Sequence, residues 1–233
     1  MRVMSATRTS LPSRSPCIFR VAALLAAIGW DRPAAAATLR GQVEFRAPAR
    51  AADYETNIYA YRPPSVAPLP EAWTAIVYVE DVEGSLAASG RARPAAIDQQ
   101  RETFIPHLLP VQVGTRVEFP NSDSTFHNVF SLSKPKRFDL GRYPRGETRS
   151  VVFDREGLVR VFCEIHSHMS ALVLVLPHPY FSRTDGSGRY LIADVPPGRY
   201  RLVAWNDRLR PRTREIEVAE RDLEVDFVLD EAR

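Results

Sequence analysis

The segment 157–177, GLVRVFCEIHSHMSALVLVLP, most limits what this chain can fold into. An alternating strand leads to Cys163, a short loop follows, and an apolar strand begins at Leu172. The loop carries three metal-binding side chains, each separated from the next by two residues: Cys163, His166 and Met169. A thiolate, an imidazole and a thioether form a soft ligand set that suits copper. The sequence therefore predicts two strands joined by a metal-binding loop.

A fourth ligand must come from elsewhere in the chain. A second imidazole would give a trigonal site of two histidines and one cysteine with a weak axial methionine, the arrangement of blue copper sites. His127, in FPNSDSTFHNVFS, is the expected supplier. One alternative is a metal-free fold with His127 and His166 as polar core residues. Another is a zinc site of one cysteine and two histidines, which would leave Met169 without a role.

Residues 1–37 are expected to be an export signal. Four arginines, the last at Arg20, precede a short apolar core at residues 21–30, and residues 34–37 supply small side chains for cleavage before Thr38. The apolar core is shorter than the ~20 residues that span a bilayer. We therefore expect a periplasmic or secreted protein with no membrane span after signal cleavage.

Cleavage would remove Cys17 and leave Cys163 as the one cysteine of the mature chain. Most cysteines of exported proteins form disulfides, so an unpaired thiol needs an explanation. A buried inert thiol or an intermolecular disulfide would account for it. Metal ligation also accounts for its spacing from His166 and Met169.

The charge of the chain gives no support for binding to nucleic acid or to an anionic membrane. The first 37 residues hold five of the 31 basic and one of the 28 acidic residues, which leaves 26 basic and 27 acidic residues. Residues 134–149 carry six basic and two acidic side chains, which could steer an acidic partner. An ordinary solvated face is the favoured interpretation of that segment.

The rest of the chain alternates as β-strands do, and no segment has helical periodicity with caps, so an all-β fold is expected. Early strands are predicted at LRGQVEF (39–45) and TAIVYVE (74–80), separated by a proline-bearing loop. Residues 84–96 are small and polar and are expected to be a linker. Residues 172–176 are apolar on both faces, which predicts cover on both.

Residues 97–177 resemble the cupredoxins, which are Greek-key β-sandwich copper proteins. The resemblance rests on His127-Asn128, on the Cys-x2-His-x2-Met loop, and on the run FPNSDSTFHNVFS, FDLG and VFCEIHSHM. The short loop is similar to that of amicyanin and pseudoazurin-type carriers, and the wider run to plastocyanin-like proteins labelled methylamine utilisation proteins. The resemblance implies one type 1 copper ion with four ligands: His127, Cys163, His166 and Met169.

The last block resembles a carboxypeptidase-regulatory-like, transthyretin-type β-sandwich. The matching runs are TDGSGRY and DVPPGRY, which are mostly turn residues. Such domains open with two further strands, which LRGQVEF and TAIVYVE would supply. We therefore expect one discontinuous sandwich, residues 38–88 with 178–233, and a cupredoxin domain, residues 97–177, inserted in it. Two sequential domains are the alternative.

These observations predict an exported electron-transfer protein with an unidentified redox partner, expected to be a monomer. A copper-delivery protein and a structural or binding β-sandwich module are the alternatives. An enzyme is not expected, because the additional paired histidines of multicopper oxidases and the His-Glu-x-x-His pattern of zinc peptidases are missing from the sequence.

Other polar residues near the predicted ligands have lesser roles. His168 is expected to lie exposed at the rim of the site, and the alternatives are a competing ligand or a place where electrons or partners enter. His107 and His178 are expected to be structural or on the surface. Asn128, with Asn121 or Ser122, is a candidate to form hydrogen bonds across the loops that carry the ligands.

Overall fold

The computed structural model describes residues 36–46, 73–81, 86 and 92–231. All of them belong to one compact unit that runs from Ala34 to Arg233. Within these ranges the structure consists of strands and turns with no helix, so the all-β prediction is confirmed for this part of the chain. The described residues accordingly contain no helix able to cross a membrane. The expected export signal lies almost entirely outside the described residues, and so does most of the proline-bearing loop.

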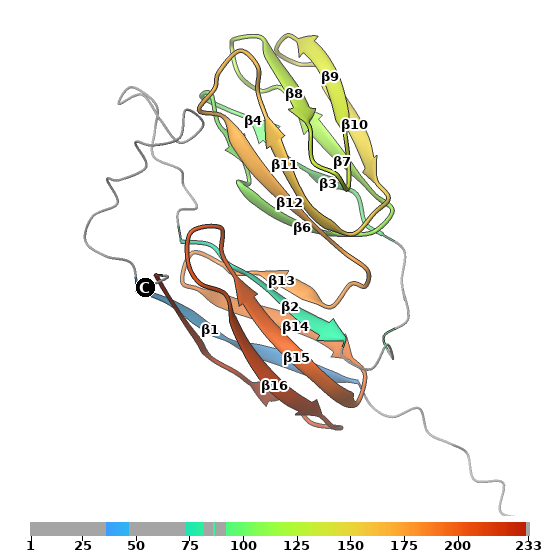
Figure 1. Ribbon diagram of the computed structural model, residues 1–233, viewed down its shortest axis with the longest axis vertical. Coiled ribbons are helices and arrows are strands. Elements are labelled where there is room, and N and C mark those ends of the chain that lie inside the picture. The colour runs from blue at the N-terminus through green and yellow to red at the C-terminus, as the bar shows by residue number, and fades with distance from the viewer. Residues whose placement is uncertain (1–35, 47–72, 82–85, 87–91, 232–233) are drawn as a thin grey trace, which may run out of the picture. The chain divides into compact units, whose positions relative to one another are not determined.

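The strands form two β-sandwiches, and Figure 1 labels most of their strands. The first sandwich consists of β1 (Ala37–Arg46), β2 (Ile76–Asp81), β13 (Phe181–Arg183), β14 (Arg189–Val195), β15 (Gly198–Trp205), β16 (Arg212–Val218), β17 (Leu223–Glu224) and β18 (Phe227–Asp230). The second consists of β3 (Ala95–Ala96), β4 (Asp98–Gln99), β5 (Phe104–Ile105), β6 (Leu108–Gln112), β7 (Thr115–Pro120), β8 (His127–Ser131), β9 (Phe138–Tyr143), β10 (Thr148–Phe153), β11 (Gly157–Phe162) and β12 (Ser170–Leu176).

The first sandwich joins strands from opposite ends of the described chain. One sheet has the order β14-β1-β17, with β18 also paired to β1, and the other has the order β13-β2-β15-β16. Apolar side chains that alternate along β1, such as Leu39 and Val43, meet Val77, Val79 and Leu202 in one core. β1 and β2 thus pair with strands that follow the second sandwich in the sequence.

The second sandwich packs the sheet β6-β12-β11-β8-β9 against the sheet β10-β7-β3. Its core includes Phe119, Phe153, Val159 and Val173, which come from both sheets. A small separate hairpin, β4-β5, belongs to the same segment. β11 and β12 are antiparallel neighbours, paired from Gly157 with Val175 to Phe162 with Ser170. The loop between them therefore lies at one end of the sheet.

Two expectations about this segment have different outcomes. β12 is buried on both faces, as predicted: Ala171 and Val173 lie in the main core, while Leu172 joins a small cluster with Ile76 and Leu108. The predicted linker 84–96 is wrong at its end, because Ala95 and Ala96 form β3 and pair with β7. The limits of the expected domains stay predictions, since residues 82–85 and 87–91 lie outside the described ranges.

Candidate metal centre

Three of the predicted ligands lie at one end of the second sandwich, on neighbouring strands. His127 is the first residue of β8, and Cys163 directly follows β11, which pairs with β8 through Phe162 and Phe130. Residues 163–169, the ligand loop, return the chain to β12. Backbone hydrogen bonds from Cys163 N to Met169 O and from Met169 N to His166 O close this loop. The antiparallel sheet therefore brings the ligand loop and His127 together.

The donor atoms of these residues converge. Nδ1 of His127 lies 3.0 Å from Nδ1 of His166, and Sγ of Cys163 lies 3.9 Å from each of these nitrogens. His127 and Cys163 are buried, whereas the side chain of His166 is 18% exposed. The three side chains form a buried group with one edge that reaches solvent.

The separations of these atoms fit one bound ion. Metal–nitrogen and metal–sulfur bonds at such sites are about 2.0 and 2.3 Å long, so ligand atoms that share an ion lie roughly 3 to 4 Å apart. Nε2 of His127 lies 3.1 Å from a carboxylate oxygen of Asp123, which favours a proton on Nε2 and leaves the Nδ1 lone pair free to bind an ion.

Met169 belongs to the same core as Cys163 and is 1% exposed. Its backbone bonds to Cys163 N and to His166 O, so Met169 closes the ligand loop. A thioether is a soft, weak ligand that suits copper and is not among the usual zinc ligands. The residues present therefore fit copper better than zinc.

Asp123 holds the buried imidazole. Its Oδ2 lies 3.1 Å from Nε2 of His127 and accepts a hydrogen bond of 2.6 Å from the backbone nitrogen of Glu102. Burial by itself raises the pKa of Asp123, but the hydrogen bonds from Glu102 and His127 outweigh it and lower the pKa below its ordinary value. Burial is the main cause that lowers the pKa of His127, and it keeps the imidazole neutral for a metal.

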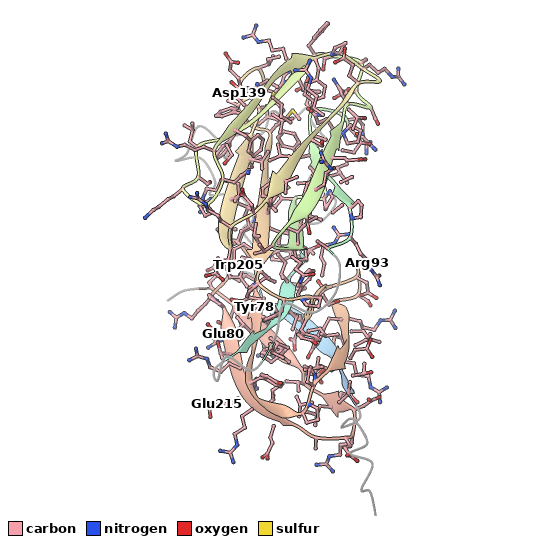
Figure 2. The ribbon with its side chains drawn as sticks, turned by 90° about the vertical axis from the view of Figure 1, so that its right-hand side faces the viewer. Tyr78, Glu80, Arg93, Asp139, Trp205 and Glu215 are labelled. Carbon is pink, nitrogen blue, oxygen red and sulfur yellow. The ribbon has the colours of Figure 1, made fainter. Side chains whose placement is uncertain are left out.

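Asn128 connects the two segments that carry the ligands, as the sequence suggested. Its Oδ1 accepts a hydrogen bond from the backbone nitrogen of Glu164, in the ligand loop. Its Nδ2 donates to Asp139 of β9, which is labelled in Figure 2. Nδ2 of Asn121 instead donates to Thr125 O in its own loop and to Tyr143 O of β9, and Oγ of Ser122 donates to Asp98. Asn128 alone of these three residues bonds to the ligand loop.

His168 is not the exposed rim residue that the sequence led us to expect. Its side chain is 8% exposed, and its Nε2 lies 3.1 Å from Oε2 of Glu102. The other oxygen of the same carboxylate lies 3.8 Å from Nε2 of His166. The prediction fails because the β4-β5 hairpin, distant in sequence, covers this side of the loop.

The two remaining histidines are buried and structural. Nδ1 of His107 lies 3.0 Å from Ser170 O, and its Nε2 lies 3.1 Å from Oδ2 of Asp207. Nδ1 of His178 accepts a hydrogen bond from the Tyr180 backbone, and the two rings are 5.5 Å apart. Neither residue belongs to the group of candidate ligands.

Several basic residues of segment 134–149 have acidic partners. Lys136 pairs with Asp154 at 2.9 Å and Arg142 with Glu164 at 3.2 Å. The Arg149 guanidinium lies 4.7 Å from the centre of the Tyr143 ring and bonds to Leu140 O. These contacts neutralise part of the local charge and favour the solvated-face interpretation of the segment.

Sequence reasoning missed two carboxylates at the site, Asp123 and Glu102. Asp123 stands four residues before His127 in a loop of serine, asparagine and aspartate, and that composition indicated a turn rather than a contact. Glu102 is distant in sequence from every candidate ligand, and nothing in its surroundings distinguishes it from a surface residue.

No protein-family model matches the chain, and no curated protein matches it either. Among solved structures it is similar to a purple cupredoxin from Nitrosopumilus maritimus, with 28% identity over 35% of this chain and 99% of that one (TM-score 0.33). A copper-containing nitrite reductase from Thermus scotoductus is 25% identical over 36% of this chain and 22% of that one (TM-score 0.35). An amicyanin mutant in the Cu(I) form is 20% identical over 43% of this chain and 98% of that one (TM-score 0.34).

These three similarities cover between 35% and 43% of the chain, and all three are to copper proteins. They give no support to the resemblance of the first sandwich to carboxypeptidase-regulatory-like domains, which stays a hypothesis based on turn residues.

Proposed function

We propose that this protein is an exported electron carrier with one type 1 copper ion, bound by His127, Cys163, His166 and Met169. The observation that carries the proposal is the convergence of two Nδ1 atoms and one Sγ atom within 3.9 Å in a buried place. Copper bound by such ligands exchanges one electron between its two common oxidation states. The cupredoxin-like sequence pattern of the second sandwich agrees with this function.

The protein surrounding favours electron transfer because it keeps the ligands in place. Backbone hydrogen bonds close the ligand loop, Asn128 connects it to β8 and β9, and Asp123 orients His127. A site that does not rearrange when its charge changes loses little energy to reorganisation. The sandwich therefore supplies rigidity, and the copper ion supplies the redox chemistry.

Burial argues for a carrier over a copper-delivery protein. A recipient would have to reach the ligands in order to take the ion, yet Cys163 is 2% exposed and His127 is fully buried. Electrons need no such access, and the edge of His166 reaches solvent.

Phe126 and Ile165, which are 58% and 40% exposed, lie next to the two histidines in sequence and offer an apolar surface for transient docking of a redox partner.

A carrier also accounts better for the site than an enzyme does. Among the described residues, the one group of three or more histidine, cysteine or acidic side chains close enough to share an ion is His127, Cys163 and His166. We further propose that the first sandwich is a scaffold or docking surface, that the protein is a monomer, and that it acts in the periplasm or outside the cell.

The test is the visible absorption and EPR spectrum of the protein loaded with Cu(II), beside Cys163→Ser. We expect a strong thiolate-to-copper band with narrow copper hyperfine splitting, and the loss of both in Cys163→Ser. Ser167→Ala, an exposed change in the same loop, is the control and should keep the band. A colourless protein, or ordinary tetragonal copper that is indifferent to Cys163, would contradict the proposal.

A further inference from the structure

The β4-β5 hairpin has an unusual turn. Gln100 and Thr103 exchange two backbone hydrogen bonds of 2.9 and 3.0 Å, so Arg101 and Glu102 are the two central residues of a tight hairpin. Their φ angles are 49° and 52°. A turn with positive φ at both central positions prefers Asn-Gly, and other L-residues there cost roughly 1–2 kcal/mol each. The chain uses Arg-Glu, although glycine would relieve this strain.

The strained residue Glu102 is directed at the candidate metal centre. Its Oε2 lies 3.1 Å from Nε2 of His168, its Oε1 lies 3.8 Å from Nε2 of His166, and its backbone nitrogen bonds to Asp123. Backbone strain of this kind persists where the surrounding contacts maintain it, and such sites are often functional. Three contacts with the site maintain it here.

The hairpin tip places a second carboxylate near the two candidate histidine ligands. Asp123 faces Nε2 of His127, and Glu102 faces Nε2 of His166. The Asp123 oxygen that faces His127 also accepts the hydrogen bond from the Glu102 amide, so the Asp123 carboxylate connects the imidazole of His127 to the turn that carries Glu102. A carboxylate that accepts a hydrogen bond from the outer nitrogen of a metal-bound imidazole orients the ring and makes it a stronger ligand, as Asp123 would for His127. Glu102 lies 3.8 Å from His166 and acts on that ring mainly through its charge.

We propose that Glu102 is a positioning residue for His166 that lowers the reduction potential of the copper site; this inference rests on the proposed function. The carboxylate lies on the outer side of the partly exposed imidazole, and its negative charge favours the oxidised ion over the reduced one. Nε2 of His168 lies 3.1 Å from the other carboxylate oxygen, on the buried side, and His168 does not belong to the group of candidate ligands.

The variant that tests the proposal is Glu102→Gln, which keeps the length and the hydrogen-bonding capacity of the side chain and removes its charge. Loss of such a partner typically weakens metal binding by 10–100-fold. We expect the ratio of Cu(II) to Cu(I) affinity to fall about tenfold, which corresponds to a rise in reduction potential of about 59 mV. Voltammetry of the copper-loaded full-length protein measures this shift.

Glu164→Gln is the matched control. It removes the same charge from the ligand loop, next to Cys163, but its carboxylate pairs with Arg142 and faces no imidazole. The rise in reduction potential in Glu164→Gln should be less than a third of the rise in Glu102→Gln. Equal shifts in the two variants would show a general charge effect and overturn the proposal. So would a change in the affinity ratio of less than twofold, about 18 mV, in Glu102→Gln.

A second measurement separates this inference from the proposed function. Ring nitrogen NMR shifts of the metal-free protein should show His166 and His168 protonated at Nε2, and Glu102→Gln should change both. If the wild-type protein has no blue band while the NMR shifts respond, the proposed function fails and the contact of Glu102 stands. If the blue band is present and neither potential nor NMR shifts respond, the role of Glu102 is disproved.

Should Glu102→Gln fold poorly, the double variant Arg101→Gly/Glu102→Gln relieves strain in the same turn and takes its place.

Discussion

Oδ2 of Asp123 lies 3.1 Å from Nε2 of His127, four residues further along the chain. The two residues thus form a carboxylate–imidazole pair within one short segment, the loop before β8 and the first residue of that strand, and Nδ1, the opposite ring nitrogen, faces Cys163 and His166. The protonation and the direction of the most buried candidate ligand are therefore set by its own segment. His166 depends instead on Glu102, from a different part of the sequence.

Asp123→Asn should weaken Cu(II) binding by about 10–100-fold, because the buried imidazole loses the partner that orients it. A competition titration of the metal-free protein with a copper chelator of known affinity measures the change. Asp98→Asn is the control, since Asp98 pairs with Ser122 and Gln100 outside the site, and should bind copper as the wild type does. Equal affinities for all three proteins would contradict the role given to Asp123.

Met169→Leu should separate the packing role of this residue from its role as a ligand. The volume of the side chain is nearly conserved, so the metal-free protein should lose less than about 1.5 kcal/mol of unfolding free energy. The copper site should nevertheless change, because loss of a weak axial donor destabilises Cu(II) and raises the reduction potential. Voltammetry and EPR of the loaded variant measure this. An unchanged spectrum and potential would show that Met169 is a core residue only.

Arg101→Gly should stabilise the metal-free protein by about 1 kcal/mol, because glycine adopts the positive φ of this turn without the steric cost that arginine bears. Urea unfolding of the metal-free form measures the change. The blue band and the reduction potential should stay as in the wild type, since the contacts to the imidazoles come from Glu102. Loss of stability in this variant would mean that the positive φ is not strained.

Asp185 should have a carboxyl pKa well below its ordinary value, because Ser187 Oγ and the backbone nitrogens of Arg189 and Ser187 donate hydrogen bonds to it. A lowered pKa in the folded state means that the carboxylate contributes stability above the unfolded value of about 3.9 and that this contribution is lost as the pH falls through the folded pKa. NMR titration of the carboxyl carbon gives the pKa. The Asp185→Asn variant should be less stable than the wild type at neutral pH, and its free energy of unfolding should change less as the pH is lowered. A titration midpoint near 4 in the folded protein would contradict this.

The candidate metal centre could be predicted from sequence where its residues are local. Cys163, His166 and Met169 share one short loop, and the alternation of β11 placed that loop at a strand end. His127 was expected because its residue type completes the ligand set, and Asn128 because it adjoins a ligand. These inferences needed only spacing and donor chemistry.

The rest of the site depends on tertiary contacts that leave no local pattern. Glu102 reaches His166 through a hairpin whose Arg-Glu turn lacks the usual Asn-Gly signal, so neither the turn nor its target could be predicted. The burial of His168 follows from the same hairpin. The pairing of Ala95 and Ala96 with β7 was missed because small residues beside a polar stretch have the composition of a linker.

The position of β1 has a consequence for the order in which the protein can fold during synthesis. All the partners of β1 lie near the other end of the described chain, and Thr38 bonds to Asp222 across 184 residues. At about 5–20 residues per second, the strand waits roughly 10 to 40 s for its partners to be made. The second sandwich is complete at Leu176, so it can close first, while the exposed edges of β1 remain a target for chaperones.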